Sequence, residues 1–143
     1  MLLKLAPNPL EQKVFAMSLL KRVVHVDDDE DILTITRMSL ELVGDFEVTQ
    51  FSSAKDALNN LKSLQPDLFL LDVMMPDMDG PELLCELRKR PEFRDTPVVF
   101  MTAKAESSIQ NTPISESALA YITKPFDPFA LPKQLKSLLE NGL

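Results

Sequence analysis

The chain has 143 residues, of which 45% are hydrophobic and 26% charged, and its formal net charge is -7. Its length and apolar content suit one globular domain with a buried core, its acidic balance argues against sequence-independent binding to nucleic acid, and its apolar runs fall short of the ~18 residues of a membrane span. The single cysteine, Cys85, excludes an internal disulfide and a cysteine-based zinc site, and it fits a reducing compartment. Together, these features predict a cytoplasmic protein with no nucleic-acid partner and no membrane insertion.

Residues 1–20 precede the first strand-like run and carry the signals of one short helix. Asn8-Pro9-Leu10-Glu11 combines a capping residue, a first-turn proline and an acid three positions after the cap. We expect an N-terminal extension over residues 1–20, with a helix from about Pro9 to Leu20, and one folded domain over residues 21–143. The extension is either incidental, with Met17 as the natural start, or a dimerisation or docking helix.

Five short runs predict β-strands, and the first, third and fourth are nearly all apolar, as in strands buried on both faces. The runs are Arg22–Val26, Phe46–Phe51, Asp67–Leu71, Pro97–Met101 and Leu119–Ile122. Four amphipathic patterns predict helices. Their apolar positions are Ile32, Ile35, Leu40 and Val43, closed by Gly44; Ala54, Ala57, Leu58 and Leu61, opened by Ser52 or Ser53; Leu83, Leu84 and Leu87, opened by Pro81; and Phe129, Leu131, Leu135, Leu138 and Leu139.

Two further features of the helical patterns matter. Cys85 lies in the third pattern, and we expect it to face the core as a small hydrophobe. A fifth pattern, Glu106–Ser117, contains Pro113, which inside a helix would remove a hydrogen bond at a cost of ~3 kcal/mol. We therefore expect this helix to start late, near residues 111–113, or to be distorted.

The alternation of strands and helices predicts an α/β fold. We expect a doubly wound, flavodoxin-like three-layer α/β/α structure, with right-handed crossovers and a five-stranded parallel sheet in the order 2-1-3-4-5. In that order the carboxyl ends of strands 1 and 3 are neighbours, which places Asp27 and Asp28 beside Asp72. Clustered carboxylates repel one another and lose hydration, so they either take up protons or bind a cation. The simplest cation for such acids is Mg²⁺.

Thr102 ends the fourth strand and Lys124 the fifth, so both should reach the same edge of the sheet as the acids. A carboxylate, a hydroxyl, an ammonium and a metal in one cleft suit phosphoryl chemistry. The metal and Lys124 would neutralise the phosphoryl oxygens, and the hydroxyl would donate to one of them. An aspartate oxygen attacking in line would give an acyl phosphate.

Around these residues the chain resembles the receiver domain of two-component response regulators, from Lys21 to about Glu140. The matching motifs are highly specific in combination. They are Val26-Asp27-Asp28-Asp29 with Asp31-Ile32, Leu71-Asp72-Val73-Met74-Met75-Pro76-Asp77-Met78-Asp79-Gly80, Met101-Thr102-Ala103 and Tyr121-Ile122-Thr123-Lys124-Pro125-Phe126.

The resemblance implies that Asp72 is the phosphoacceptor and that Asp27 and Asp28 hold Mg²⁺. The backbone carbonyl of Met74 would be the third protein ligand. Met74 and Lys104 also stand where the family tunes dephosphorylation, and neither is an obvious base for an attacking water. We therefore expect slow to moderate self-dephosphorylation.

The resemblance also implies a switch. Thr102 would be the hydroxyl that moves toward the phosphoryl group, and Tyr121 the aromatic partner that changes rotamer with it. Lys124 would bind phosphoryl oxygens, with a cis bond to Pro125 after it. The chain departs from the family over Ser115-Glu116-Ser117-Ala118-Leu119-Ala120, where the family has a glycine and acidic residues, which puts partner choice in question.

Other polar residues of the motifs have structural explanations. Glu30 and Asp31, and in part Asp29, are acids favoured at a helix start by the helix dipole. His25 lies within an apolar strand, where we expect a buried neutral side chain rather than a phosphodonor. Tyr121 could alternatively be an exposed aromatic at the sheet edge.

Acidic residues in this pattern also occur in three other kinds of protein. An aspartate-nucleophile phosphohydrolase needs a second acid two residues after the nucleophile, and Met74 stands there after Asp72. A calcium loop beginning at Asp27 is rejected because Ile32 stands where glycine is needed and Met38 where glutamate is needed. A phosphorylation-independent interaction module stays open as the alternative function.

The sequence thus predicts a stand-alone receiver that is not a turnover enzyme. It would accept a phosphoryl group from a histidine kinase or a histidine-phosphotransfer protein, with Mg²⁺ required. It would signal by contact with a downstream protein target or by phosphorelay. We expect a monomer or weak dimer.

Overall fold

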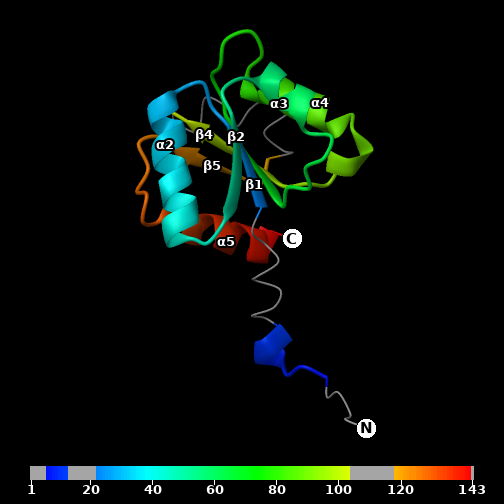
Figure 1. The fold of residues 1–143 in the computed structure, drawn as a ribbon, viewed down its shortest axis with the longest axis vertical. Coiled ribbons are helices and arrows are strands. Elements are labelled where there is room, and N and C mark those ends of the chain that lie inside the picture. The colour runs from blue at the N-terminus through cyan, green and yellow to red at the C-terminus, as the bar shows by residue number, and fades with distance from the viewer. Residues whose placement is uncertain (1–5, 13–21, 104–117, 143) are drawn as a thin grey trace.

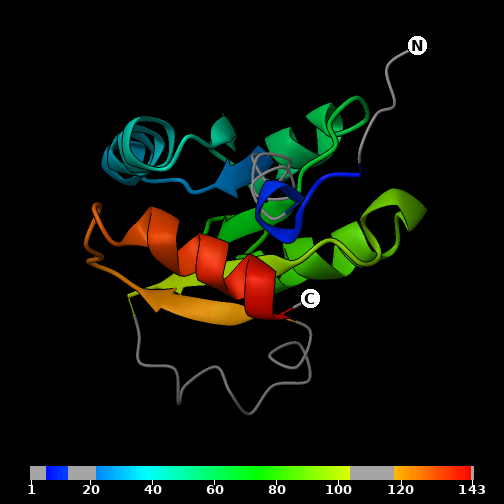
Figure 2. The same ribbon diagram turned by 90° about the horizontal axis from the view of Figure 1, so that it is seen from below.

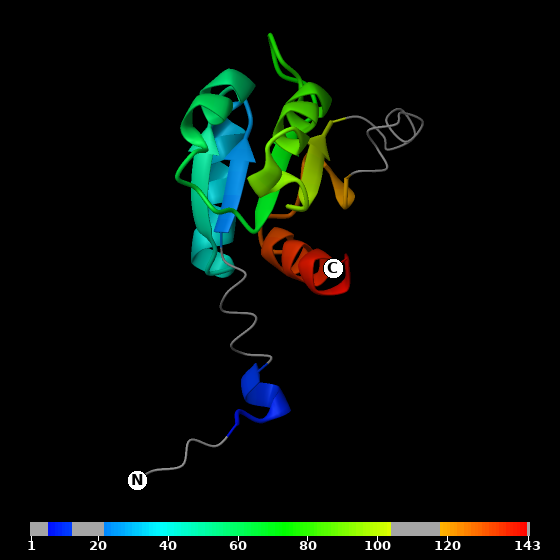
Figure 3. The ribbon, with the colours of Figure 1, turned by 90° about the vertical axis from the view of Figure 1, so that its right-hand side faces the viewer.

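The computed structural model describes residues 6–12, 22–103 and 118–142. Five parallel strands form one sheet in the order β2-β1-β3-β4-β5, and Figure 3 shows them side by side from teal β2 to orange β5. The doubly wound α/β fold and its strand order are confirmed. The strands are β1 Arg22–Val26, β2 Glu47–Phe51, β3 Leu68–Asp72, β4 Val98–Thr102 and β5 Ala120–Thr123.

Helices cover both faces of this sheet. They are α2 Glu30–Met38, continued by a π-helical turn Ser39–Val43, then α3 Ala54–Asn60, α4 Gly80–Arg88 and α5 Leu131–Gly142. In Figure 1, α2 lies on one side of the sheet and α3 and α4 lie on the other. Figure 2 shows that α5 covers the same face of the sheet as α2.

The alternation of side chains along the strands divides the core into two layers. Val24, Val26 and Phe100 face α3 and α4, and belong to a cluster with Leu83 and Leu87. The other layer packs against α5 and the π-helical turn. It contains Val23, Leu70, Val99, Met101, Ile122, Leu40, Leu131, Leu135 and Leu139. Strands β3 and β4 are buried along their whole length, which explains their nearly continuous apolar sequences.

The signals at the helix starts are confirmed. Asp29 caps α2, since its carboxylate accepts from the backbone N–H groups of Asp31 and Ile32. Ser53 caps α3 by accepting from Asp56 N. In the N-terminal extension, residues 9–12 form one helical turn. Asn8 and Glu11 exchange the two hydrogen bonds of a capping box there. The rest of the expected helix, residues 13–20, lies outside the described residues.

Several expectations about helix faces are wrong. Cys85 is exposed rather than core-facing. Ile35 and Val43, expected in a buried stripe, are 40% and 48% exposed. The helix also widens into a π-helical turn over Ser39–Val43, which departs from the regular periodicity on which the expected stripe was based. Phe129 is 77% exposed and precedes α5 instead of belonging to it. The fifth helical pattern, with Pro113, lies outside the described residues.

The exposed apolar side chains of these segments share one groove. It has a volume of about 590 Å³ and runs between the α2 segment and the loop before α5. Its apolar lining includes Ile35, Met38, Leu42, Val43 and Phe129. In the part of the chain that the structure describes, no helix is long and apolar enough to cross a membrane.

Gly80 provides a test of how tightly the loop after β3 packs. A Cβ at this position would lie 2.4 Å from the backbone oxygen of Asp72 and 3.0 Å from Val73 Cα. Backbone atoms cannot move aside easily, so we expect Gly80→Ala to lower the free energy of unfolding by roughly 1–3 kcal/mol. Helix propensity alone would raise it by up to about 1 kcal/mol.

Urea unfolding of the wild type and of Gly80→Ala measures the change in the free energy of unfolding. Cys85→Ala in the same helix is the matched control. Because Cys85 is exposed, its replacement should change the free energy by no more than about 0.5 kcal/mol. A Gly80→Ala protein as stable as the wild type would show that the loop can shift to accept a side chain.

Candidate functional site

Three carboxylates meet at the carboxyl edge of the sheet. Asp27 follows β1 directly and Asp72 is the last residue of the neighbouring strand β3. One oxygen from each of Asp27, Asp28 and Asp72 lies within 4.8 Å of the others. Asp27 and Asp72 are buried whereas Asp28 is exposed, so the acid cluster opens to solvent on one side only.

One ammonium group lies against the two buried acids. Lys124 Nζ donates a hydrogen bond to Asp27 Oδ2 at 2.7 Å and lies 3.3 Å from Asp72 Oδ1. Lys124 follows β5, and its backbone N–H donates to Thr102 O. The Lys124-Pro125 peptide bond is cis, as the resemblance implied. The hydrogen bond from Lys124 N to Thr102 O continues the parallel pairing of β4 and β5, and it places Lys124 at the edge of the sheet that carries the acids.

The site has too little positive charge for its acids. Burial and then the negative charge of Asp27 raise the pKa of Asp72, and Lys124 offsets part of their effect, so that the pKa is about 7. Burial opposes the charge on Lys124, but its hydrogen bonds and charge interactions with Asp27 and Asp72 outweigh burial and raise its pKa. Without another cation, Asp72 is therefore mostly protonated below about pH 7 and ionises as the pH rises above it.

The donor set of the acid cluster fits a hard divalent cation such as Mg²⁺. All three side chains offer oxygen atoms, and the exposed side of Asp28 leaves room for water to complete the coordination. A divalent cation would also replace the proton on Asp72, because it supplies the missing positive charge. These residues can therefore hold a metal ion that lowers the repulsion between Asp27 and Asp72.

The loop after β3 wraps closely around Asp72. Gly80 N donates to Val73 O at 2.9 Å, which brings the start of α4 back against the end of the strand. Asp77 takes a positive φ of 69° in this loop, a conformation that aspartate tolerates better than most residues. Met74 N lies 3.4 Å from Asp72 Oδ1, and the Met74 side chain is exposed beside it.

Thr102 and Tyr121 lie on the neighbouring strands. Thr102 is buried at the end of β4, one residue beyond Met101, which pairs with Asp72 across the sheet. Tyr121 of β5 is partly buried, and its ring stacks on Phe100 with centroids 5.7 Å apart. Thus Tyr121 is not an exposed edge residue, and it packs with the layer that contains α3 and α4.

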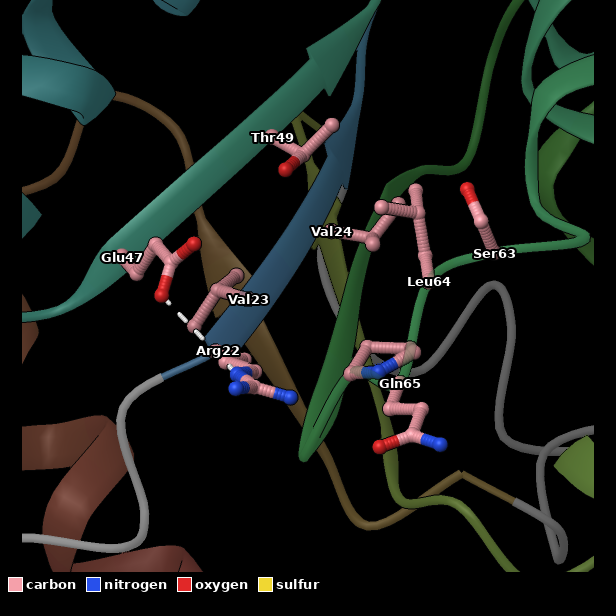
Figure 4. Close-up of a pocket in the computed structure, with 9 residues that line it drawn as sticks. Arg22, Val23, Val24, Glu47, Thr49, Ser63, Leu64 and Gln65 are labelled. Carbon is pink, nitrogen blue, oxygen red and sulfur yellow. Dashed lines mark ion pairs between the residues drawn. The ribbon is translucent and has the colours of Figure 1, made fainter.

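A second cavity lies at the opposite edge of the sheet. It has a volume of about 250 Å³ and is formed by the starts of β1 and β2 and the loop before β3. Figure 4 shows Arg22 and Glu47 at this cavity, joined by an ion pair of 3.8 Å. Its lining contains no member of the acid cluster, so the two sites are separate.

The comparison with known proteins agrees with this geometry. The family model described as "Response regulator receiver domain" matches residues 23–136. The alkaline phosphatase synthesis transcriptional regulatory protein PhoP of Bacillus subtilis is 34% identical over 122 residues, which are 85% of this chain and 50% of that protein. The regulatory protein VanRc of Enterococcus gallinarum is 36% identical over 121 residues, which are 85% of this chain and 51% of that protein. The chain spans about half the length of these curated relatives.

Solved structures show the same fold. The chemotaxis protein CheY4 of Vibrio cholerae superposes with a TM-score of 0.76 at 26% identity, covering 83% of this chain and 98% of that chain. The response regulator protein TrrA of Thermotoga maritima, solved in complex with Mg(2+)-BeF, has a TM-score of 0.71 at 30% identity. That alignment covers 82% of this chain and 98% of the TrrA chain.

The raised pKa of Asp72 predicts a pH-dependent effect of Asp72→Asn on stability. Between the ordinary value of 3.8 and about 7, the folded protein binds more protons than the unfolded chain. The contribution of Asp72 to stability is therefore lost as the pH rises through this window. Asparagine is neutral at every pH, so Asp72→Asn should stabilise the metal-free protein more at about pH 8 than at about pH 5.

Thermal unfolding of both proteins in the presence of a chelator measures this difference. Addition of Mg²⁺ to the wild type at the higher pH should recover part of the gap. An equal gap between wild type and variant at both pH values would show that Asp72 is not protonated in the folded metal-free protein.

Proposed function

This chain belongs to the response regulator receiver domain family, and on that premise we propose that Asp72 accepts a phosphoryl group from a phosphohistidine. The donor would be a histidine kinase or a histidine-phosphotransfer protein. The observation that carries the proposal is the placement of Asp72 at a strand end, beside two acids that suit a metal and within 3.3 Å of the Lys124 ammonium. This arrangement pairs a nucleophilic carboxylate with the positive charges that phosphoryl oxygens need.

The transfer proceeds by in-line attack. An oxygen of the Asp72 carboxylate forms a bond to phosphorus as the bond from phosphorus to the donor imidazole nitrogen breaks, and the imidazole leaves. Lys124 lies against Asp72 Oδ1 and donates to the phosphoryl oxygens. The hydroxyl of Thr102, at the end of the adjoining strand, donates to another of them.

When bound, Mg²⁺ neutralises charge on the phosphoryl oxygens. Asp27, Asp28, Asp72 and the backbone carbonyl of Met74 would hold it, as the family's motif implies. The acid cluster supports this part of the proposal, since its three carboxylates offer an all-oxygen donor set. The burial of Asp27 and Asp72 excludes water from the inner side of the cluster.

Phosphorylation would bias a two-state element on β4 and β5. Thr102 moves toward the phosphoryl group, and Tyr121 changes rotamer in response. The partial burial of Tyr121 and its stacking on Phe100 support this step, because a ring in that place cannot move without repacking its neighbours. The altered surface then contacts a downstream protein target, or the phosphoryl group is relayed onward.

The protein is, in this proposal, an acceptor with slow self-dephosphorylation and not a turnover enzyme. Met74, whose side chain is exposed next to Asp72, is a thioether and cannot activate water. Lys104, the other position that tunes dephosphorylation, lies outside the described residues. The stand-alone organisation and the monomeric or weakly dimeric state stay predictions of the sequence.

Intact-protein mass spectrometry tests phosphoryl acceptance. Incubation with a small acyl phosphate and Mg²⁺ should add one phosphoryl group to the wild type and none to Asp72→Asn. A chelator should abolish the adduct. Asp77→Asn is the matched control, because Asp77 is an exposed acid of the same loop whose backbone conformation asparagine also tolerates.

An adduct that persists in Asp72→Asn would place the acceptor elsewhere. The absence of an adduct in wild type would favour an interaction module that works without phosphorylation. A generic phosphate ester should not be hydrolysed with turnover by either protein, and sustained turnover would instead indicate a phosphohydrolase.

The lifetime of the adduct tests the role of Met74. After removal of the phosphodonor, the phosphoryl group on the wild type should outlast a period of seconds, because the thioether of Met74, exposed next to Asp72, cannot act as a base toward water. Met74→Asn should shorten this lifetime severalfold, since an amide can hydrogen-bond the attacking water. The decay of the phosphorylated mass with time measures the lifetime in the wild type and in Met74→Asn. A wild-type lifetime of seconds or less would contradict slow self-dephosphorylation.

A further inference from the structure

His25 is the single histidine of the chain and is completely buried. It lies on β1, between Gln50 of β2 and Leu70 of β3 in the sheet register. Its Nε2 is 4.0 Å from Asp27 Oδ2, and it has no hydrogen-bond partner among the described residues. A buried N–H group without an acceptor is unfavourable and calls for a physical reason.

The neighbours of His25 decide which ring nitrogen carries the proton. Arg37 Nε donates to Gln50 Oε1 at 3.1 Å, and because a guanidinium has only donors, the orientation of the Gln50 amide is fixed. The amide nitrogen of Gln50 therefore faces Leu33 O at 2.7 Å and His25 Nδ1 at 3.1 Å.

Since this NH₂ group can only donate, His25 Nδ1 must accept, and the proton of the neutral ring lies on Nε2. Burial among these groups, together with the charges of Lys124 and Arg37, lowers the pKa of His25 to about 3 and keeps the ring neutral. The N–H of the imidazole is thus directed toward Asp27.

Asp27 has two oxygens, and both have donors in this structure. Oδ1 accepts from Asp29 N at 2.9 Å, and Oδ2 accepts from Lys124 Nζ at 2.7 Å. A phosphoryl group on Asp72 would compete for Lys124, because Nζ lies only 3.3 Å from Asp72 Oδ1. Asp27 Oδ2 would then lose its donor in a fully buried position, which is costly for a carboxylate.

We propose that His25 is a positioning residue that supplies the missing donor: its Nε2–H hydrogen-bonds Asp27 Oδ2 when Lys124 turns to the phosphoryl group. The inference rests on the proposed function, because it requires a phosphoryl group on Asp72. The two atoms are 4.0 Å apart, so a movement of about 1 Å brings them to hydrogen-bond distance. The bond keeps the Asp27 carboxylate oriented toward the metal position while Lys124 is engaged with the phosphoryl group.

The contacts of His25 also reach the protein surface. Arg37, which fixes the Gln50 amide, forms an ion pair of 2.7 Å with Glu41 on the partly exposed face of the α2 segment. A series of polar contacts therefore joins that surface to the acid cluster. It runs from Arg37 through Gln50 and His25 to Asp27, and each group has a defined orientation. Each contact depends on the one before it, so the tautomer of His25 is built into the packing of α2 against β1 and β2.

NMR of the ring nitrogens tests the proposal directly, because one histidine gives one set of signals. In the free protein, Nε2 should be protonated and Nδ1 unprotonated. Addition of beryllofluoride and Mg²⁺, a stable phosphoryl mimic, should move the Nε2–H proton downfield and slow its exchange, with the tautomer unchanged. The backbone amides of Gly80 and Thr102 report in the same experiment whether the mimic binds.

Each outcome has a defined meaning. A free protein with the proton on Nδ1 would overturn the proposal. So would an Nε2–H signal that stays in place while the amides of Gly80 and Thr102 shift. If no amide shifts, the site does not take a phosphoryl mimic, and the proposed function fails together with this inference.

His25→Leu tests the consequence for binding. The substitution places an apolar side chain of similar size in the core and removes the donor. The affinity for beryllofluoride with Mg²⁺, titrated through the Thr102 amide, should fall about tenfold, the loss that corresponds to one hydrogen bond to a charged group.

Leu70→Val is the matched control, because it removes a methylene from the cross-strand neighbour of His25 and disturbs only packing. It should lower stability and leave this affinity unchanged. An affinity of His25→Leu equal to that of the wild type, or equally reduced in Leu70→Val, would overturn the proposal.

Discussion

The structure depends on one electrostatic constraint: two buried carboxylates share a single ammonium group. Asp27 and Asp72 lie at the ends of adjacent strands, and Lys124 Nζ contacts both. One positive charge cannot neutralise two negative charges, so the pKa of Asp72 rises to about 7 once burial has removed most of its hydration. A cation bound next to Asp28 would relieve this deficit, and a phosphoryl group on Asp72 would redistribute it. The chemistry proposed for the site follows from this imbalance.

The fold creates the constraint because a parallel sheet places all strand ends of one kind at the same edge. In the order β2-β1-β3-β4-β5, the chain reverses direction of winding between β1 and β3, and the acids that follow these two strands become neighbours. The apolar layers on both faces hold the strands in register. The close approach of Gly80 to the backbone of Asp72 then fixes the loop above the acid, so the position of the carboxylate is determined by the packing of its main chain.

Much of this arrangement is predictable from the sequence, because strands buried on both faces are nearly continuous apolar runs and their terminal acids are easily recognised. The strand order alone places Asp72 and Lys124 at the same edge of the sheet, two strands apart. Their contact depends on the long lysine side chain, which reaches back across the end of β4. The helix faces were less predictable. Ile35 is 40% exposed and Cys85 is exposed although the neighbours of both in their patterns are apolar, and the π-helical turn over Ser39–Val43 cannot be read from those patterns. The contact of Gln50 with His25 depends on the register of β1 against β2, which no local pattern contains.

The small number of hydrogen-bond donors to Asp27 also explains why a buried histidine beside the acid cluster is tolerated. An apolar residue at position 25 would pack as well and would leave no unpaired N–H in the core. The cost of that group is offset only in a state where Asp27 needs a donor. Among the described residues, the ammonium group that contacts Asp27 is that of Lys124, which also lies 3.3 Å from Asp72. Any process that draws Lys124 toward Asp72 therefore changes what Asp27 requires. His25 lies on β1 beside Asp27, and Arg37 of α2 fixes its orientation through Gln50. A change in charge at Asp72 therefore alters hydrogen bonds at β1 as well as at β4 and β5.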